Sequence, residues 1–156
     1  YLSIGSNLGN RIENIEKAKF KLIEKGVFII RSSSYYETLS WPDPRKPKFY
    51  NIVLKIKTKL GKIELIKICK EIEKFLGRKN TLKNSPRECD IDILDYGKIS
   101  FNKGINLPHP RMHKRNFVLF PLFEVDRNWK HPIFKQHIKT LIFSLSNRDI
   151  SSIKQI

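Results

Sequence analysis

Two aspartates, Asp90 and Asp92, stand one residue apart in a segment where polar and apolar residues alternate. This alternation is typical of a β-strand with one buried face, and side chains two residues apart on a strand point to the same side. The two carboxylates would therefore lie about 6.5–7 Å apart on one face, with Ile91 and Ile93 on the other. Carboxylates this close repel each other unless a cation lies between them. Mg²⁺, which binds oxygen ligands and usually shares them with substrate phosphates, suits the pattern.

A basic residue precedes the acid pair. Arg87 follows Pro86 and stands three residues before Asp90, where a phosphate bound to such a metal would meet a planar cation. The alternative is an ordinary solvated sheet face on which each aspartate pairs with a lysine. The two acids alone are compatible with both interpretations, whereas the Pro-Arg lead-in and the apolar opposite face favour a site.

A second candidate anion-binding residue is His109, which lies between Pro108 and Pro110. An imidazole on this rigid corner, with Arg111 and Arg115 close behind, suits an anion, although it could also simply pack at the edge of a loop. We treat the other three histidines, His113, His131 and His137, as surface residues. The sequence contains neither a P-loop nor a G-x-G-x-x-G motif, and no pair of cysteines is spaced for zinc.

Size and composition predict one domain, residues 1–156. The chain begins with Tyr1 rather than Met, so this domain could be part of a longer polypeptide. The net charge of +16 suggests an anionic partner, but the lysines are dispersed, so it favours phosphate ligands more than nucleic acid. No apolar run approaches the roughly 20 residues of a membrane span. Cys69 and Cys89 read as reduced core thiols. We therefore expect a cytoplasmic monomer that binds neither membrane nor nucleic acid.

The order of the expected elements is β-α-β-β-α-β followed by helices. Strands are expected at residues 1–5, 27–36 and 49–58, at the acid pair, and over a short stretch near 99–101. Helices are expected at 11–25, 62–76, 117–125 and 138–145, with Pro121 in the first turn of the third helix. The segments 38–48 and 78–86 are expected to be loops, the second of them mobile, and residues 96–98 a turn. This order predicts an α+β, ferredoxin-like fold with a mixed or antiparallel sheet and additional C-terminal helices.

Several of these segments together resemble one enzyme family, 6-hydroxymethyl-7,8-dihydropterin pyrophosphokinase. The resemblance extends from Tyr1 to about Val125, and its blocks occur in the family's order. The blocks are residues 2–9, 33–38 with 49–51, 73–78, 86–94 and 107–119. The resemblance implies that the hydroxymethyl oxygen of the pterin attacks the β-phosphorus of ATP, that AMP leaves, and that a pterin diphosphate forms in folate biosynthesis.

The resemblance also implies roles for individual residues. Asp90 and Asp92 would hold two Mg²⁺ ions, and Asp90 would also contact the pterin. Four basic residues would contact the phosphates: Arg78, Arg87, His109 and Arg115. Of these, Arg78 and Arg87 would be catalytic together with the two aspartates. Two residues would line the nucleotide pocket: Glu73 and Ile93. Five residues would form the pterin pocket. Phe49 and Phe117 would stack on the pterin ring, and Asn51 would hydrogen-bond its edge. Thr38 and Leu39 would contribute backbone groups.

The chain departs from the family pattern in the lid segment and the pterin pocket. Ser85 replaces the usual small Gly or Ala, and Asn84 replaces an aromatic residue that many members carry. The 78–86 loop is shorter by about one residue, and Phe49 replaces the commoner Tyr.

Two other functions compete with the pyrophosphokinase. The β-α-β-β-α-β order also occurs in RNA-recognition modules, although aromatics would then be expected where this chain has acids. A metal-dependent nuclease built on the two acids is the third alternative.

Overall fold

The computed structural model describes residues 1–40, 43–78, 85–102 and 106–156. Its elements are β1 (Leu2–Ser6), α1 (Arg11–Glu24), β2 (Val27–Ser32), β3 (Tyr36–Thr38), β4 (Phe49–Thr58), α2 (Lys62–Phe75), β5 (Asp90–Ile93), the 3-10 helix η1 (Met112–Lys114), α3 (Asn116–Val125), α4 (Ile138–Phe143), α5 (Asn147–Ser151) and β6 (Lys154–Gln155). Within these residues, every helix is too short or too polar to cross a bilayer.

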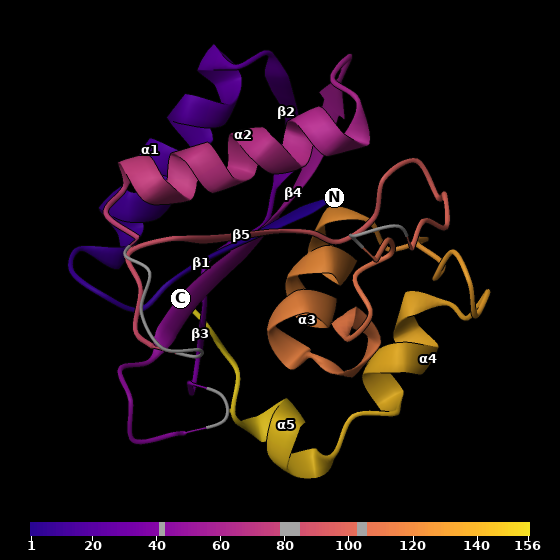
Figure 1. Ribbon diagram of the computed structural model, residues 1–156. Helices are drawn as coiled ribbons and strands as arrows, with labels where there is room; N and C mark the ends of the chain where they lie inside the picture. Colours follow the sequence, from indigo (N-terminus) through magenta and orange to yellow (C-terminus); the bar gives the residue numbers. More distant parts are fainter. Residues whose placement is uncertain (41–42, 79–84, 103–105) are drawn as a thin grey trace.

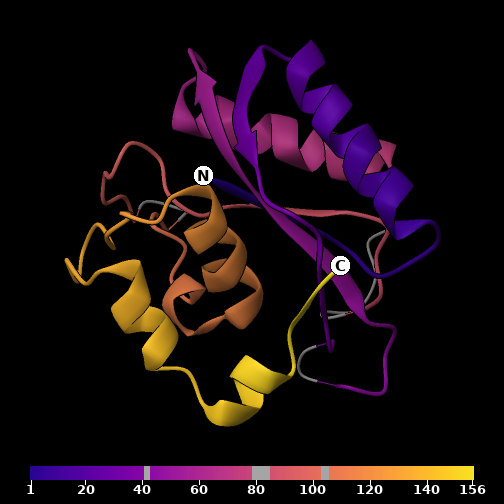
Figure 2. The same cartoon turned by 180° about the vertical axis from the view of Figure 1, so that it is seen from behind.

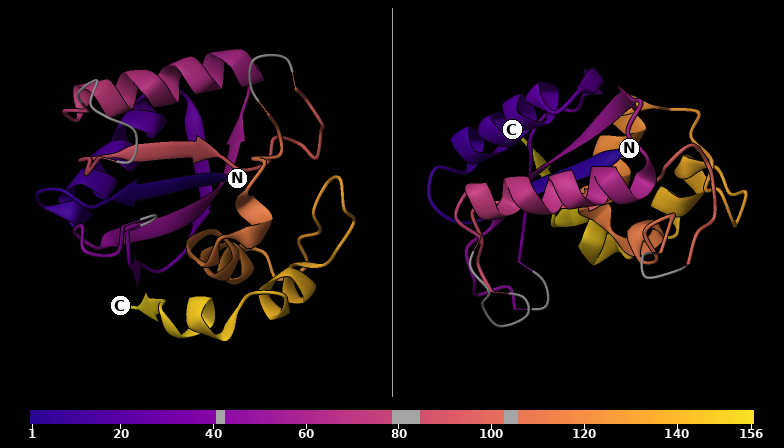
Figure 3. Two further views of the ribbon diagram at one scale, coloured as in Figure 1. Left: turned by 60° about the horizontal axis from the view of Figure 1, so that its bottom comes forward. Right: turned by 45° about the horizontal axis from the view of Figure 1, so that its top comes forward.

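The sheet has the strand order β5-β1-β4-β3-β6, with β2 pairing the other half of β4. Every strand pair in the described part of the chain is antiparallel. The helices α1 and α2 lie together on one side of the sheet, and α3 lies on the opposite side with α4 and α5 beyond it (Figures 1 and 3). The predicted α+β, ferredoxin-like arrangement is therefore confirmed, and the sheet is antiparallel.

Two apolar cores lie on the two faces of the sheet. The core beneath α1 and α2 contains the inward residues of β1, β4 and β5 and the apolar stripes of both helices. The core beneath α3 is smaller and includes Val53 of β4, Leu94 just after β5, and Trp129. Cys69 and Cys89 are free and buried, as expected. Because side chains alternate along each strand, the residues of β5 that face α3 are Asp90 and Asp92.

The single strand expected over 27–36 is two strands, β2 and β3, which pair with the two halves of β4. The break lies at Ser33, whose backbone N–H donates to the Val53 carbonyl at 2.9 Å while its hydroxyl accepts from the Val53 N–H at 2.9 Å. A serine hydroxyl thus replaces a backbone carbonyl in the ladder. The short strand expected near 99–101 is only an isolated bridge between Phe101 and Leu107.

Other differences lie in the C-terminal third. Pro121 is the sixth residue of α3 and not in its first turn, because the helix already begins at Asn116; a proline there has no N–H to donate to the preceding turn. The last predicted helix ends at Phe143, and α5 and β6 follow it. The strand β6 pairs with β3 and extends the sheet (Figure 2). His131 is buried, not on the surface, at 2% exposure. Most of the 78–86 loop, residues 79–84, lies outside the described residues.

Candidate active site

The two aspartates lie on an edge strand of the sheet. Asp90 pairs with Gly5 and Asp92 with Ser3 in the β1–β5 register. Ile91 and Ile93 point the other way into the core beneath α1 and α2, with exposures of 2% and 8%. The predicted division of β5 into an acidic face and an apolar face is therefore confirmed. The acidic face looks toward α3.

Two arginines contact Asp90. Its Oδ1 atom lies 2.7 Å from Arg78 Nη1 and 3.1 Å from Arg87 Nη1. Arg78 reaches this position because the chain turns back toward β5 at Gly77, two residues after the end of α2, with a φ of +102° that is accessible mainly to glycine. Burial acts to lower the pKa of Arg78, but the carboxylates of Asp90 and Glu73 outweigh burial and raise it. Arg78 is therefore a permanent cation at the acid pair.

Asp92 has a different pair of neighbours. Its Oδ2 atom lies 3.5 Å from Arg115 Nη1 and 3.8 Å from His109 Nε2, and these two nitrogens are 3.4 Å apart. Burial lowers the pKa of His109, Asp92 acts to raise it, and Arg115 and Arg111 lower it further, so the imidazole is neutral at pH 7. His109 is held by its backbone N–H, which donates to the Leu94 carbonyl at 2.8 Å.

Glu73 connects α2 to the outer edge of β5. Its side chain is 1% exposed, its Oε1 accepts from the Ile91 backbone N–H at 2.7 Å, and its Oε2 lies 2.5 Å from Arg78 Nη1. Lys70 also contacts Oε1, at 2.9 Å. An edge strand has backbone groups without a strand partner, and Glu73 satisfies one of them. The structure thus gives Glu73 a positioning contact, and its predicted contact with the nucleotide stays a prediction.

The predicted pterin residues lie on the same face, beyond Gly5. Gly5 pairs with Asn51 of β4 as well as with Asp90. A Cβ atom at Gly5 would meet Asn51 Oδ1 at 2.9 Å and the Phe49 ring at 3.4 Å. Asn51 Nδ2 in turn donates to Thr38 Oγ1 at 2.9 Å, and both side chains are buried. Only a glycine at this position lets the Asn51 amide and the Phe49 ring approach β1 this closely, next to the acid pair.

The remaining predicted residues differ in their burial and in the face of the sheet on which they lie. Phe117 is the second residue of α3 and is partly buried, with the Arg115 guanidinium 5.3 Å from its ring centroid. Leu39 follows β3 and is 40% exposed. Ile93 belongs to the core beneath α1 and α2 and so does not share the acidic face; its contact with a nucleotide stays a prediction. Asn7 is not among the predicted site residues, although its amide oxygen accepts from the Arg87 backbone N–H.

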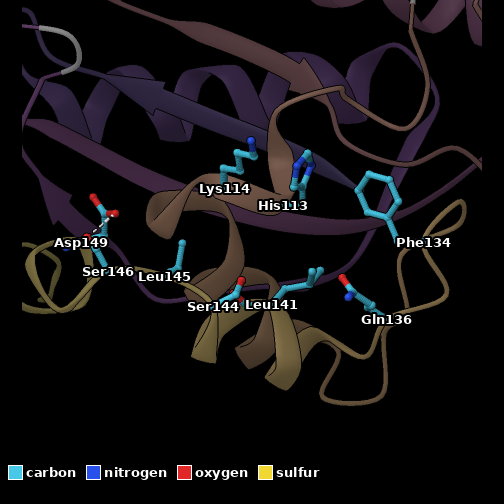
Figure 4. A pocket seen from close by; sticks show the side chains of 9 residues that line it. All are labelled: His113, Lys114, Phe134, Gln136, Leu141, Ser144, Leu145, Ser146 and Asp149. Atoms are coloured by element: carbon cyan, nitrogen blue, oxygen red, sulfur yellow. Dashed lines mark hydrogen bonds between the residues drawn. The ribbon is translucent and has the colours of Figure 1, made fainter.

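A separate hollow of about 710 Å³ lies between η1, α4 and α5 (Figure 4). Its lining includes His113, Lys114 and Phe134 on one side and Leu141 and Leu145 on the other, and it contains none of the predicted site residues. Burial lowers the pKa of His113, and Lys114 lowers it further. Because this hollow contains none of the predicted site residues, the acid pair with its arginines is the feature of the described chain that we assign to an anionic substrate.

The donor set of the acid pair fits Mg²⁺ better than a transition metal. The described residues contain no group of three or more His, Cys, Asp or Glu side chains that could hold an ion. Two carboxylates alone offer only hard oxygen ligands and leave most positions to water or to substrate phosphates. Mg²⁺ is usually bound in this way, through one or two carboxylates plus phosphate oxygens.

Comparisons with known proteins agree with this geometry. The family model of 7,8-dihydro-6-hydroxymethylpterin-pyrophosphokinase (HPPK) matches residues 1–127. A 2-amino-4-hydroxy-6-hydroxymethyldihydropteridine pyrophosphokinase of Aquifex aeolicus is 43% identical over 140 residues, which cover 89% of this chain and 87% of that protein. The folic acid synthesis protein fol1 of Pneumocystis carinii is 37% identical over 154 residues, 98% of this chain but 21% of that protein.

Solved structures share the fold. An HPPK-DHPS triple mutant of Plasmodium falciparum with pteroate has a TM-score of 0.73 at 15% identity, and the match covers 99% of this chain and 46% of that one. This chain thus spans less than half of the HPPK-DHPS chain and about a fifth of the Pneumocystis protein. The family model, which covers most of the sequence and all of the acid pair, together with the Aquifex relative, shows that the chain belongs to the 7,8-dihydro-6-hydroxymethylpterin-pyrophosphokinase family, the enzymes of folate biosynthesis that transfer a pyrophosphoryl group from ATP to a hydroxymethylpterin.

Proposed function

We propose that this chain transfers the pyrophosphoryl group of ATP to 6-hydroxymethyl-7,8-dihydropterin. The hydroxymethyl oxygen forms a bond to the β-phosphorus, the bond from that phosphorus to the oxygen bridging to the α-phosphate breaks, and AMP leaves with the bridging oxygen. The hydroxyl proton passes to water. The single observation that supports this assignment best is the acid pair on β5, with two arginines on Asp90 and a third on Asp92.

Arg78, Arg87 and Arg115 bind the triphosphate. Each lies within 3.5 Å of an aspartate oxygen, so the three cations lie together where phosphate charge would be stabilised. Phosphoryl-type transfer depends mainly on positioning and on charge stabilisation rather than on covalent chemistry by the protein. His109 is neutral and 3.4 Å from Arg115, so it can donate a hydrogen bond to a phosphate without adding charge.

Asp90 and Asp92 hold two Mg²⁺ ions together with the triphosphate. When bound, these ions neutralise charge on the phosphate oxygens and orient the triphosphate. The proposal is supported by the two hard carboxylate donors on one face of β5. Each acid is paired with an arginine, so Mg²⁺ bound at the acids would compete with these arginines and leave them able to pair with phosphate oxygens.

The pterin binds over Gly5, between the acid pair and Asn51. Phe49 and Phe117 stack on the pterin ring, since aromatic faces bind flat heterocycles well. Asn51 hydrogen-bonds the pterin edge, and its buried amide is fixed by Thr38. Backbone groups of Thr38 and Leu39 complete the pocket. The hydroxymethyl group would then point along the sheet toward Asp90, the neighbour of Gly5 in the register.

A direct assay tests this function. The purified protein is incubated with ATP, Mg²⁺ and 6-hydroxymethyl-7,8-dihydropterin, and nucleotides are separated by chromatography. We expect AMP that appears only when both the pterin and Mg²⁺ are present. ADP would instead indicate transfer of the γ-phosphoryl group, and nucleotide release from DNA or RNA would indicate a nuclease; either outcome would overturn the proposal.

We further propose that the enzyme works as a monomer in the cytoplasm, on these two small substrates and without nucleic acid or membrane. The two buried free cysteines support a reducing compartment. Size-exclusion chromatography with light scattering tests the monomer: an apparent mass near 18.4 kDa for this chain is expected, and twice that mass would contradict it.

A further inference from the structure

We propose that Asn7 is a positioning residue that holds the nucleotide side and the pterin side of the active site in register; this proposal rests on the proposed function. Asn7 directly follows β1 and is 3% exposed. Its side chain connects two segments that are far apart in the sequence, the backbone at Arg87 and the loop between β3 and β4. The proposed chemistry assigns Asn7 no contact with either substrate.

On the nucleotide side, Asn7 holds the Arg87 peptide from both directions. Asn7 Oδ1 accepts a hydrogen bond from the Arg87 backbone N–H at 2.8 Å, and the Asn7 backbone N–H donates to the Arg87 carbonyl at 3.1 Å. These two bonds continue the β1–β5 pairing beyond its last register pair, Gly5 with Asp90. The Arg87 guanidinium, 3.1 Å from Asp90, therefore extends from a backbone of fixed position.

On the pterin side, the same amide holds both ends of a loop. Asn7 Nδ2 donates to Ser40 Oγ at 3.2 Å and to the Pro47 carbonyl at 3.0 Å. The Ser40 hydroxyl donates to that Pro47 carbonyl at 2.5 Å, which closes a three-membered network. Ser40 lies two residues after Thr38, and Pro47 two residues before Phe49, so this network sets the ends of the strands that carry the pterin pocket.

Only an amide can make this connection. One planar group supplies an acceptor for the Arg87 N–H and two donors for the loop, and three hydrogen bonds use most of its capacity. An aspartate of the same shape keeps the acceptor but loses both donors and would place a buried carboxylate oxygen against the Pro47 carbonyl. An alanine loses every side-chain bond. The two substitutions therefore separate the two sides of the connection.

Steady-state kinetics test the proposal. For Asn7→Asp we expect the pterin KM to rise about tenfold while the ATP KM stays within about twofold, because only the loop donors are lost. For Asn7→Ala we expect kcat/KM to fall about 100-fold with both KM values raised, since misplacement of about 1 Å can cost this much. Ser40→Ala removes both bonds of the Ser40 hydroxyl but keeps the bond from Asn7 Nδ2 to the Pro47 carbonyl, so it should raise only the pterin KM, by about threefold.

Asn14→Ala is the matched control. Asn14 lies close to the turn that follows β1. Its Nδ2 donates to the Leu8 carbonyl at 2.9 Å and to Ser6 Oγ at 3.4 Å, and these bonds reach neither Arg87 nor the loop between β3 and β4. Its kinetic constants should stay within about twofold of the unsubstituted chain. Equal changes in both KM values for Asn7→Asp, or kinetic changes in Asn14→Ala as large as in Asn7→Ala, would overturn the proposal.

Amide hydrogen exchange of the substrate-free protein gives a readout that needs no activity. The Arg87 N–H should exchange at least about tenfold faster in Asn7→Ala, and at its original rate in Asn7→Asp, where the acceptor remains. If the unsubstituted chain forms no AMP but this exchange pattern holds, the proposed function fails while the Asn7 connection stands. If the Arg87 exchange rate is the same in both variants and in the unsubstituted chain, the connection itself is wrong.

Discussion

Gly5→Ala should weaken pterin binding while leaving the fold almost unchanged. A Cβ at this position would lie 2.9 Å from Asn51 Oδ1, whereas an ordinary contact between carbon and oxygen is about 3.3 Å or more. The Asn51 amide must therefore move by about 0.4 Å, away from its 2.9 Å hydrogen bond to Thr38. Scaled from a loss of about 100-fold for 1 Å, this displacement predicts a rise of about fivefold to tenfold in the pterin KM.

The stability terms for this substitution nearly cancel. Alanine in a strand gains about 0.5–1 kcal/mol over glycine because the unfolded chain is less flexible. Weakening one buried hydrogen bond costs about 0.5–1.5 kcal/mol. The free energy of unfolding from a urea titration should therefore change by less than about 1 kcal/mol, so a kinetic effect would not arise from unfolding.

The assay measures AMP formation at varied pterin and varied ATP. The ATP KM should stay constant, because the added methyl group faces Asn51 and Phe49 and not the arginines. Gly61→Ala is the control: a Cβ there meets nothing within 4 Å, so both KM values should be unchanged. An unchanged pterin KM in Gly5→Ala, or a matching rise in the ATP KM, would refute the placement of the pterin over Gly5.

Three further predictions follow from individual contacts. Asp92→Ala should lower turnover by at least about 10³-fold without changing the circular dichroism spectrum, because Asp92 is outside both cores; near-normal turnover would contradict its role. Glu73→Gln should lower the free energy of unfolding in urea by about 1.5–3 kcal/mol, since it removes the buried charge that pairs with Arg78, and an unchanged value would contradict the importance of that pair. His131 Nδ1 accepts from the backbone N–H groups of Ile133 and Phe134, both at 3.2 Å, and burial followed by His113 lowers its pKa while Asp95 acts to raise it. The unfolded state therefore binds the proton more readily: stability is full above about pH 6.5 and is lost as pH falls toward the folded pKa, by at most about 1.4 kcal/mol per pH unit from this group. His131→Asn, which keeps an acceptor but cannot titrate, should flatten this part of the curve in pH-dependent urea titrations, and an unchanged slope would contradict it.

The parts of the fold that the sequence predicted are those determined locally. The alternation around Asp90 and Asp92 predicted which side chains share a face, because side-chain direction on a strand depends only on position along it. The apolar stripe of α2 and the turn at Gly77 just after the helix were likewise readable, since helical periodicity and the need for a positive φ are local properties. These two elements position Arg78 against the acid pair.

The parts that the sequence did not predict depend on partners far along the chain. The break between β2 and β3 arises because Ser33 bonds to Val53, twenty residues away. His131 is buried because it packs against Trp129 and stacks on Phe134, with ring centroids 4.3 Å apart in the stack. Glu73 appeared only as a nucleotide-pocket residue, and no local pattern indicates that its carboxylate reaches the edge of β5.

The ion pairs of the site explain how acidic and basic side chains can share one small face of the sheet. Asp90 and Asp92 would repel each other without the three arginines, and the arginines would repel each other without the acids. Under the proposed function, Mg²⁺ at the carboxylates and phosphate at the arginines would replace these pairs with pairs of the same kind. Gly5 and Asn7 carry no charge at this face: Gly5 lets Asn51 and Phe49 approach β1, and Asn7 bonds both to the Arg87 backbone and to the loop between β3 and β4, which is the basis of the positioning role proposed for it.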